Sequence, residues 1–277
     1  MKFQYFTFFL NPVANLFEDK RDKNEILAEV LTKKEPLPYE HRAVKLAYLF
    51  TERYDGYIVG KVGRKSILKR NLPPNQKFEE TTEENWPHCE ILFNLSKDQN
   101  KGQRIAFELK SSVFSSPYEQ LKAFSDEINS RIMMSGYAIS INPITKEQKF
   151  WSIVSENKGK MEKLSLTFNA PNLFNLKNTL TEELKEAQDS YKMTKTIVEF
   201  ENPDGQLAVP EENDFLKQGV DYITRGGGEY SLKIKGRGRK IISSKDNIET
   251  KSFEFDDLEF KTDLPDFIKN LIKQIFD

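Results

Sequence analysis

Residues 103–141 read QRIAFELKSSVFSSPYEQLKAFSDEINSRIMMSGYAISI and contain the clearest helix of the chain, with a strand on each side. Ser116 and Glu119 have the spacing of a capping box, and Pro117 suits the first helical position. An apolar stripe with helical spacing follows, so the pattern predicts a helix over 117–133 that packs on a sheet. The stripe consists of Leu121, Phe124, Ile128 and Ile132.

Strands are predicted on both sides of this helix, because short apolar runs are bounded by turn residues. Upstream they lie at 3–10, 44–50, 57–62, 89–93 and 103–108, with the turn Tyr54-Asp55-Gly56 closing one hairpin and residues 97–102 closing another. Downstream they lie at 137–141, 150–154, 164–168, 194–201, 229–235 and 239–243. Further helices are expected at 23–31 and 178–190. The polar stretch 64–87 is interpreted as an exposed, mobile connector.

This order of elements predicts an α+β protein with mainly antiparallel sheets, a few packing helices and a chain in two parts. A length of 277 residues is enough for two domains at roughly 150 residues each. The turn-forming Asn169-Ala170-Pro171-Asn172 sets the expected boundary. We therefore expect an N-terminal α+β domain over 1–171. A C-terminal α+β domain over 172–277 would contain a basic hairpin and a terminal amphipathic helix.

Composition restricts the classes of partner. The 42 Lys and Arg residues balance 43 Asp and Glu residues, so nucleic acid could be held only by a local patch. One cysteine, Cys89, cannot form an internal disulfide, which favours a cytoplasmic location. The apolar opening 3–10 is too short to cross a bilayer, so no membrane insertion is expected.

Common catalytic and cofactor motifs are missing from the sequence. Two histidines and one cysteine are too few for an ordinary zinc site, and His88 and Cys89 would point to opposite faces of a strand. A Cys–His pair would need His41, for which there is no local signal. Around Gly60-Lys61 the phosphate-binding pattern fails, and no hydrolase or calcium-loop motif occurs. We expect neither a cofactor nor a metal.

One enzymatic alternative remains open. Glu108 and Lys110 form an E-x-K pair on a predicted strand, the form in which metal-dependent nucleases place a metal-binding acid and a lysine on one face. The second acid would be Glu90 or Asp98. The same pair is also a common arrangement of charges on an exposed strand.

A glycine-rich basic segment is the main candidate for binding DNA. It carries Gly226-Gly227-Gly228, Gly236 and Gly238 among its cations, while residues 246–277 carry nine acids against four lysines. Lys233, Lys235 and Arg237 would share a strand face, and Arg239 would join them in the absence of a bulge. The glycines would allow phosphates to approach the backbone. The candidate contacts are Arg225, Lys233, Lys235, Arg237, Arg239 and Lys240, with Lys245 nearby. Alternatively, the charges protect a solvated sheet edge.

The chain ends in an amphipathic helix with Asp263 as its expected cap. Its apolar face would be buried against its own domain or across a two-fold interface. The apolar residues are Leu264, Phe267, Ile268, Leu271, Ile272, Ile275 and Phe276.

The order of these pieces resembles the RexA phage-exclusion family and related phage-defence proteins. The resemblance covers about residues 1–175 and has no catalytic signature. The features that carry the resemblance are the aromatic first strand, Tyr54-Asp55-Gly56, Trp86-Pro87, Val113-Phe114, the helix of 117–133, the strand 150–154 and Asn169-Ala170-Pro171-Asn172. It implies a cytoplasmic protein of phage exclusion or abortive infection, a homodimer that binds DNA with low sequence preference beside a separate effector protein.

We therefore expect a non-enzymatic, DNA-binding sensor or regulator in bacterial phage defence, with the basic hairpin as its site. A metal-dependent nuclease that uses Glu90, Glu108 and Lys110 is the first alternative. The second alternative is a protein-interaction scaffold of a defence system, for which the terminal helix would be the contact surface.

Overall fold

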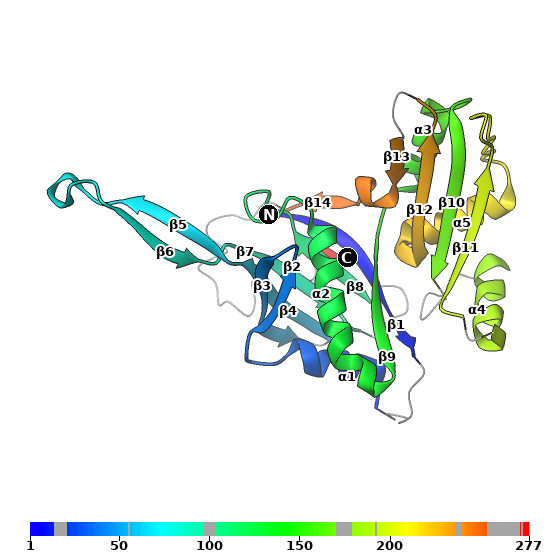
Figure 1. Cartoon of the computed structure of the whole chain (residues 1–277). Helices are drawn as coiled ribbons and strands as arrows, with labels where there is room; N and C mark the ends of the chain where they lie inside the picture. Colours follow the sequence, from blue (N-terminus) through cyan, green and yellow to red (C-terminus); the bar gives the residue numbers. More distant parts are fainter. Residues whose placement is uncertain are drawn as a thin grey trace.

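The computed structural model describes residues 1–13, 21–54, 56–96, 103–169, 179–191, 193–236 and 240–253, with residues 272 and 274–276 near the C-terminus. The protein is α+β, with mainly antiparallel sheets and a few helices packed on them, as the sequence predicts (Figure 1). Two sheets, each with its own hydrophobic cluster, form a first and a second unit.

The first unit is built on an eight-stranded sheet in the order β14-β1-β8-β7-β4-β3-β2, with β9 also paired to β1. Strand β1 joins its parts, because residues 2–7 pair with β14 and β8 while residues 6–12 pair with β9. The bounds are β1 Lys2–Pro12, β2 Leu37–His41, β3 Val44–Tyr54, β4 Tyr57–Arg64, β7 His88–Asn94, β8 Arg104–Glu108, β9 Tyr137–Pro143 and β14 Thr250–Ser252.

Helices α1 (Lys23–Leu31) and α2 (Pro117–Ile132) cover one face of this sheet. The Ser116 hydroxyl accepts a hydrogen bond from the Glu119 backbone N–H at 3.4 Å, so the cap of α2 lies where the sequence predicts it. The stripe from Leu121 to Ile132 is buried against the sheet. Burial of this apolar stripe is the main force that holds α2 in place.

The opposite face of the sheet is covered by the C-terminal end of the chain. Ile272, Ile275 and Phe276 are buried with Phe3, Tyr5, Val59, Leu92 and Ala106. The rings of Phe276 and Tyr57 lie 5.6 Å apart. The described part of the terminal helix is therefore core, whereas Asp263, Leu264, Phe267, Ile268 and Leu271 lie outside the described residues.

A two-stranded sheet projects from the first unit as an arm, which we define as residues 66–85 (Figure 1). It consists of β5 (Ser66–Asn71) and β6 (Glu80–Asn85), which pair from Ser66↔Asn85 to Asn71↔Glu80. The stretch 64–87 is exposed, as expected of a connector, but it contains two paired strands that the sequence pattern did not predict. Its adjacent apolar residues Ile67 and Leu68 lie on opposite faces among polar side chains, so the alternation that signals a strand is missing.

The second unit is a four-stranded sheet in the order β11-β10-β12-β13, with helices that contribute to its hydrophobic cluster. The strand bounds are β10 Met161–Asn169, β11 Lys195–Glu201, β12 Gly228–Ile234 and β13 Lys240–Ser243. The helix bounds are α3 Glu147–Glu156, α4 Thr179–Tyr191 and α5 Asp214–Tyr222, with a π turn at Ile223–Gly227.

Helix α3 replaces the strand expected at 150–154. Phe150, Trp151, Ile153 and Val154 are all buried in the second cluster. A short apolar run fits a strand or a buried helix equally well, and only the tertiary packing decides between them. Helix α5 is also absent from the elements that the sequence predicts, although Asn213 caps it by accepting a hydrogen bond from Leu216 N–H at 3.0 Å.

The change from the first unit to the second precedes the expected boundary at residue 171. β9 ends at Pro143 in the first sheet, and α3 begins at Glu147 with its apolar residues in the second cluster. Strand β10, which ends at Asn169, also belongs to the second sheet. After β13 the chain returns to the first sheet, where β14 pairs with β1 from the other end of the sequence.

Candidate nucleic-acid interface

The basic segment of 225–245 does not form one continuous face. Arg225 lies in the π turn and forms an ion pair with Asp221 at 2.8 Å. Lys233 pairs with Glu162 at 2.6 Å on the exposed face of the second sheet. Lys245 lies 3.8 Å from Glu229. These three cations are thus balanced by carboxylates.

The predicted strand face of Lys233, Lys235 and Arg237 is interrupted, because β12 ends at Ile234. Lys235 follows the strand and donates from Nζ to the backbone carbonyl of Asp204 at 2.9 Å. Lys240 begins β13 and is exposed. Arg237 and Arg239 lie outside the described residues, so their places in the interface stay predictions.

Two lysines that the sequence analysis missed lie beside Lys235. The backbone N–H of Lys235 donates to the carbonyl of Lys160 at 2.7 Å, and Lys158 precedes it in the exposed turn before β10. We call Lys158, Lys160, Lys235 and Lys240 the basic end of the second sheet. The only local signal was the short sequence Lys158-Gly159-Lys160, and the pairing of β10 with β12 brings it to the hairpin.

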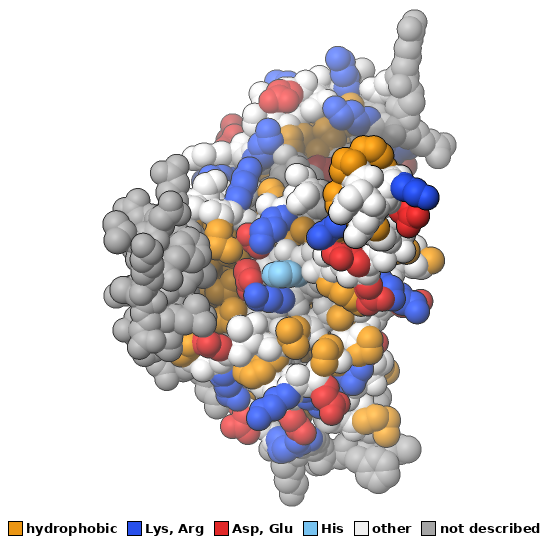
Figure 2. Space-filling view, turned by 90° about the vertical axis from the view of Figure 1, so that its left-hand side faces the viewer, with side chains coloured by type: hydrophobic (Ala, Val, Ile, Leu, Met, Phe, Trp, Pro, Cys, Tyr) orange, Lys and Arg blue, Asp and Glu red, His pale blue; other side chains and the backbone are white. Residues whose placement is uncertain are grey.

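The four lysines of the basic end are exposed, and none forms an ion pair with a carboxylate in the described parts of the chain. The side toward which the arm points carries interspersed basic and acidic side chains (Figure 2). On the arm, Lys69 pairs with Glu80 at 2.9 Å and Arg70 with Glu83 at 3.0 Å.

The glycines of 226–228 are packed against other protein atoms, Gly226 against the first unit and Gly227 and Gly228 within the second. A Cβ at Gly226 would lie 2.4 Å from the Thr7 side chain, and one at Gly227 would lie 2.3 Å from the Tyr222 ring. At Gly228 the clash would be with the backbone oxygen of Thr167, at 1.8 Å. The expectation that this run allows phosphates to approach is therefore wrong, because neighbouring protein atoms fill the space.

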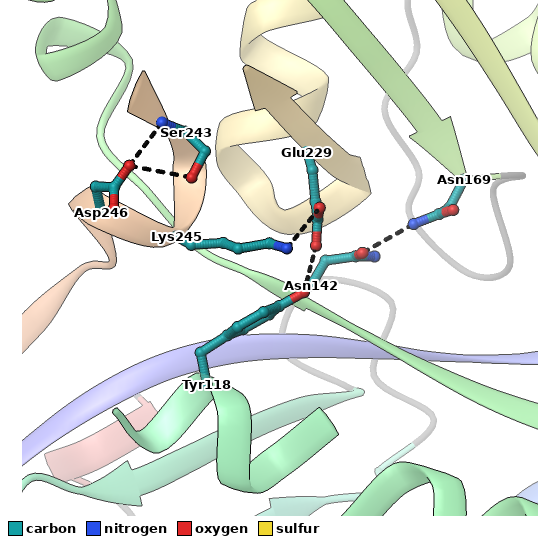
Figure 3. A network of polar contacts seen from close by, with 7 residues as sticks. All are labelled: Tyr118, Asn142, Asn169, Glu229, Ser243, Lys245 and Asp246. Atoms are coloured by element: carbon teal, nitrogen blue, oxygen red, sulfur yellow. Dashed lines mark hydrogen bonds and ion pairs between the residues drawn. The ribbon is translucent and has the colours of Figure 1, made fainter. Parts of the chain in front are cut away.

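A polar network fixes the second unit against the first (Figure 3). Tyr118 in α2 donates to Glu229 in β12 at 2.6 Å, and Lys245 lies over the Tyr118 ring at 4.9 Å. Asn169 in β10 donates to Asn142 in β9 at 2.9 Å. Burial, followed by the nearby charge of Glu229, raises the pKa of Tyr118, so this hydroxyl remains a donor at neutral pH.

Beside this network, Thr7 in β1 donates to the carbonyl of Gly226 at 2.6 Å, and the Asn142 amide reaches the same oxygen at 3.3 Å. Both contacts are buried. Because buried hydrogen bonds are costly to leave unmade, these contacts hold the π turn on β1 and β9. The position of β12, and with it the basic end, follows from this junction.

The residues of the nuclease alternative do lie together, at the ends of β7 and β8. Glu108 is buried, and its Oε2 accepts from the Glu90 backbone N–H at 3.0 Å and from Lys110 Nζ at 2.7 Å. The Glu90 carboxylate lies 3.5 Å from Lys61 Nζ. Burial raises the pKa of Glu90 above its ordinary value. Asp98 lies outside the described residues.

The described residues contain no group of three or more His, Cys, Asp or Glu side chains able to hold a metal ion. Cys89 is buried, and burial raises the pKa of its thiol to about 12, so the thiolate that a nucleophile or metal ligand needs is not formed at neutral pH. The adjacent His88 ring lies 3.3 Å from the Trp86 carbonyl and is exposed. No described helix is long and apolar enough to cross a membrane.

The fold and site together define an α+β protein with two antiparallel sheets, a projecting arm and a cluster of exposed lysines at one end of the second sheet. Comparisons with protein-family models, with characterised proteins and with solved structures find no match to this chain.

Proposed function

We propose that this protein is a non-enzymatic DNA-binding protein that acts as a sensor or regulator in bacterial phage exclusion or abortive infection. In this proposal it works in the cytoplasm as a homodimer, binds DNA with low sequence preference and acts beside a separate effector protein. The observation that carries the DNA-binding part is the basic end, where four exposed lysines have no described carboxylate partner. The phage-exclusion part depends on the resemblance in the sequence.

Exposed lysines without carboxylate partners are suited to phosphates. Each phosphate contact releases condensed counterions from DNA, which gives affinity without reading the bases. Lys158 and Lys160 come from the turn before β10, while Lys235 and Lys240 come from the hairpin of β12 and β13. The pairing of β10 with β12 therefore brings two separate segments into one patch. Arg237 and Arg239, which lie between Lys235 and Lys240 in the sequence, would extend it.

The test is an electrophoretic mobility assay on unrelated DNA sequences over a salt series. Replacing Lys158, Lys160, Lys235 and Lys240 with Ala should weaken binding to all sequences alike. The slope of log affinity against log salt should flatten by about one unit for each lost contact. A second variant, Lys235→Ala with Arg237→Ala and Arg239→Ala, tests the loop.

The matched control replaces Lys163 and Lys233, two lysines of the same sheet that form ion pairs with Glu199 and Glu162. This control should leave the slope unchanged. An unchanged slope in the basic-end variant would remove this segment from the site. Phage plating on cells that produce the wild-type chain or the variants then tests the exclusion role.

The nuclease alternative has less support. Lys110 and the Glu90 backbone already engage one oxygen of Glu108. We expect no magnesium-dependent cleavage of plasmid DNA, and cleavage that Glu108→Gln abolishes would favour the nuclease instead. The scaffold alternative is weakened because Ile272, Ile275 and Phe276 are buried within their own chain.

A further inference from the structure

The arm is a sheet without a covering layer. Within the described parts of the chain its two strands pair only with each other, whereas a single hairpin is marginally stable in water. Two of its apolar side chains point into solvent, Ile67 at 68% exposure and Phe78 at 65%. Lys77 and Phe78 both have positive φ, of 55° and 56° respectively. This conformation costs energy for residues with a side chain. Exposed apolar side chains on a projecting hairpin favour a role for it as a contact surface.

The charges of the arm are divided between its strands. Strand β5, which begins directly after Lys65, carries Lys69 and Arg70. Strand β6 carries Glu80, Glu83 and Glu84. Each cation pairs with an acid across the hairpin: Lys69 with Glu80, Arg70 with Glu83, and Lys65 with Glu84. One long side of the arm is therefore basic and the other is acidic.

The two faces of the arm also differ. Side chains alternate along a strand, so Ile67 and Lys69 share one face of β5. Lys65, which precedes β5, pairs with Glu84 on the same face. On β6 the residues of this same face are Glu80, Thr82 and Glu84. The Trp86 indole donates to Glu84 at 2.7 Å. We call this the Ile67 face. The other face carries Leu68, Arg70, Thr81 and Glu83.

We propose that the Ile67 face is a self-association surface whose partner is the same face of a second copy of this chain. Two arms would stack face to face about a two-fold axis parallel to the arm, which sets the basic strand of each copy over the acidic strand of the other. Ile67 and Trp86 would then lose solvent exposure in both copies.

Charge selects this arrangement over the alternatives. Pairing the arms edge to edge about a two-fold axis would set Lys69 and Arg70 against their own copies, or the three glutamates against theirs, and like charges in register are destabilising. Joining a β5 edge to a β6 edge is not symmetric and would give an open chain of molecules. The stacked pair satisfies the charges and closes as a dimer.

The inference rests on the homodimer of the proposed function and is independent of its DNA-binding part. Six-residue strands span about 20 Å, so two arms bury an area at the low end of specific interfaces, below about 1,200 Å². The dimer should therefore be weak and should depend on protein concentration.

The first experiment measures mass by analytical ultracentrifugation of the full chain over a concentration series. Ile67→Asp and Thr82→Arg, both on the Ile67 face, should each weaken the dimer by about tenfold or more. Thr81→Arg is the matched control, because Thr81 is the exposed neighbour of Thr82 on the other face, and it should leave the dimer intact. Circular dichroism checks that each variant keeps the fold.

The second experiment reverses charges in pairs. A variant with Lys65→Glu, Lys69→Glu, Glu80→Lys and Glu84→Lys keeps both pairings within its own arm and should dimerise with itself. Mixed with the wild-type chain, it should form no mixed dimers in native mass spectrometry, since like charges would then face each other. The matched control exchanges Arg70 with Glu83 on the other face and should form mixed dimers freely.

A dimer that Ile67→Asp and Thr82→Arg do not weaken, or free mixing of the first exchanged variant with the wild type, would overturn this inference alone. A wild-type chain that stays monomeric over the whole concentration range would overturn the inference and the proposed homodimer together. The DNA mobility assay reports on the basic end separately in either case.

Discussion

Gly228 in β12 lies so close to β10 that a side chain there would meet the backbone of Thr167. Backbone atoms cannot rotate away as a flexible side chain can, so the strands would have to separate. Gly236, two residues beyond the end of β12, has no atom within 4 Å of an added Cβ. These two glycines of one basic segment therefore have different structural roles.

Gly228→Ala should lower the free energy of unfolding by about 1–3 kcal/mol or more, because it overpacks a buried strand pair. Gly236→Ala should change it by less than about 0.5 kcal/mol, since the site is open. Urea denaturation of both variants measures the difference. Equal effects would mean that β10 and β12 are not held at the distance that the structure gives.

Glu90 makes stability depend on pH. Burial raises the pKa of its carboxyl, so the folded state holds the proton more tightly than the unfolded state does. Ionisation of Glu90 therefore lowers the free energy of unfolding of the wild type as pH rises from the ordinary pKa of 4.5 through the raised pKa. Glu90→Gln does not titrate, so its stability relative to the wild type should rise over the same range. Urea unfolding from about pH 4 to pH 7 tests this, and a constant difference would contradict it.

Helix α2 and helix α3 differ in how much of their structure is local. The capping box and Pro117 mark the start of α2, and its stripe repeats at helical spacing. Helix α3 has no side-chain cap, and its apolar run is short. A local signal therefore identifies α2, whereas α3 depends on burial of Phe150 and Val154 in the second cluster.

Ser116→Ala should lower the free energy of unfolding by about 1 kcal/mol, because the Glu119 N–H loses its acceptor. Ser130→Ala is the control within the same helix, since its exposed hydroxyl donates to the Glu127 carbonyl one turn back and caps no helix end. That variant should stay within about 0.5 kcal/mol of the wild type. Thermal and urea unfolding give both values, and equal losses would argue against the cap.

At the scale of the whole molecule, the junction between the units decides where the basic end lies. Tyr118 and Glu229 are far apart in sequence and connect α2 of the first unit to β12 of the second. A hydrogen bond to a charged group contributes more than a neutral one, and burial strengthens it. The two units should therefore unfold with measurable coupling.

A double-mutant cycle of Tyr118→Phe and Glu229→Gln should give a coupling energy of about 1 kcal/mol in urea unfolding. The control cycle combines Tyr118→Phe with Glu199→Gln, because Glu199 lies on the edge strand β11 and pairs with Lys163. The control cycle should be additive. Additivity in both cycles would mean that the Tyr118 contact does not hold the units together.

Local patterns in the sequence determined much of the fold. They place β1, α1, the β3–β4 and β7–β8 hairpins, α2, α4 and the β12–β13 hairpin, because turn residues, caps and periodicity act over a few neighbours. The α+β class follows from their order. The E-x-K pair is close in sequence as well as in space, since Glu108 ends β8 and Lys110 lies two residues beyond it.

Only the tertiary structure decided the rest. The arm has no regular apolar alternation, α3 is a helix because of the cluster it enters, and Glu108 pairs with Phe3 on the sheet face that the end of the chain covers. Lys158 and Lys160 join Lys235 only through the pairing of β10 with β12, and the glycine run is packed because β1 and β10 lie against it. These features depend on contacts between residues distant in sequence, which no local pattern contains.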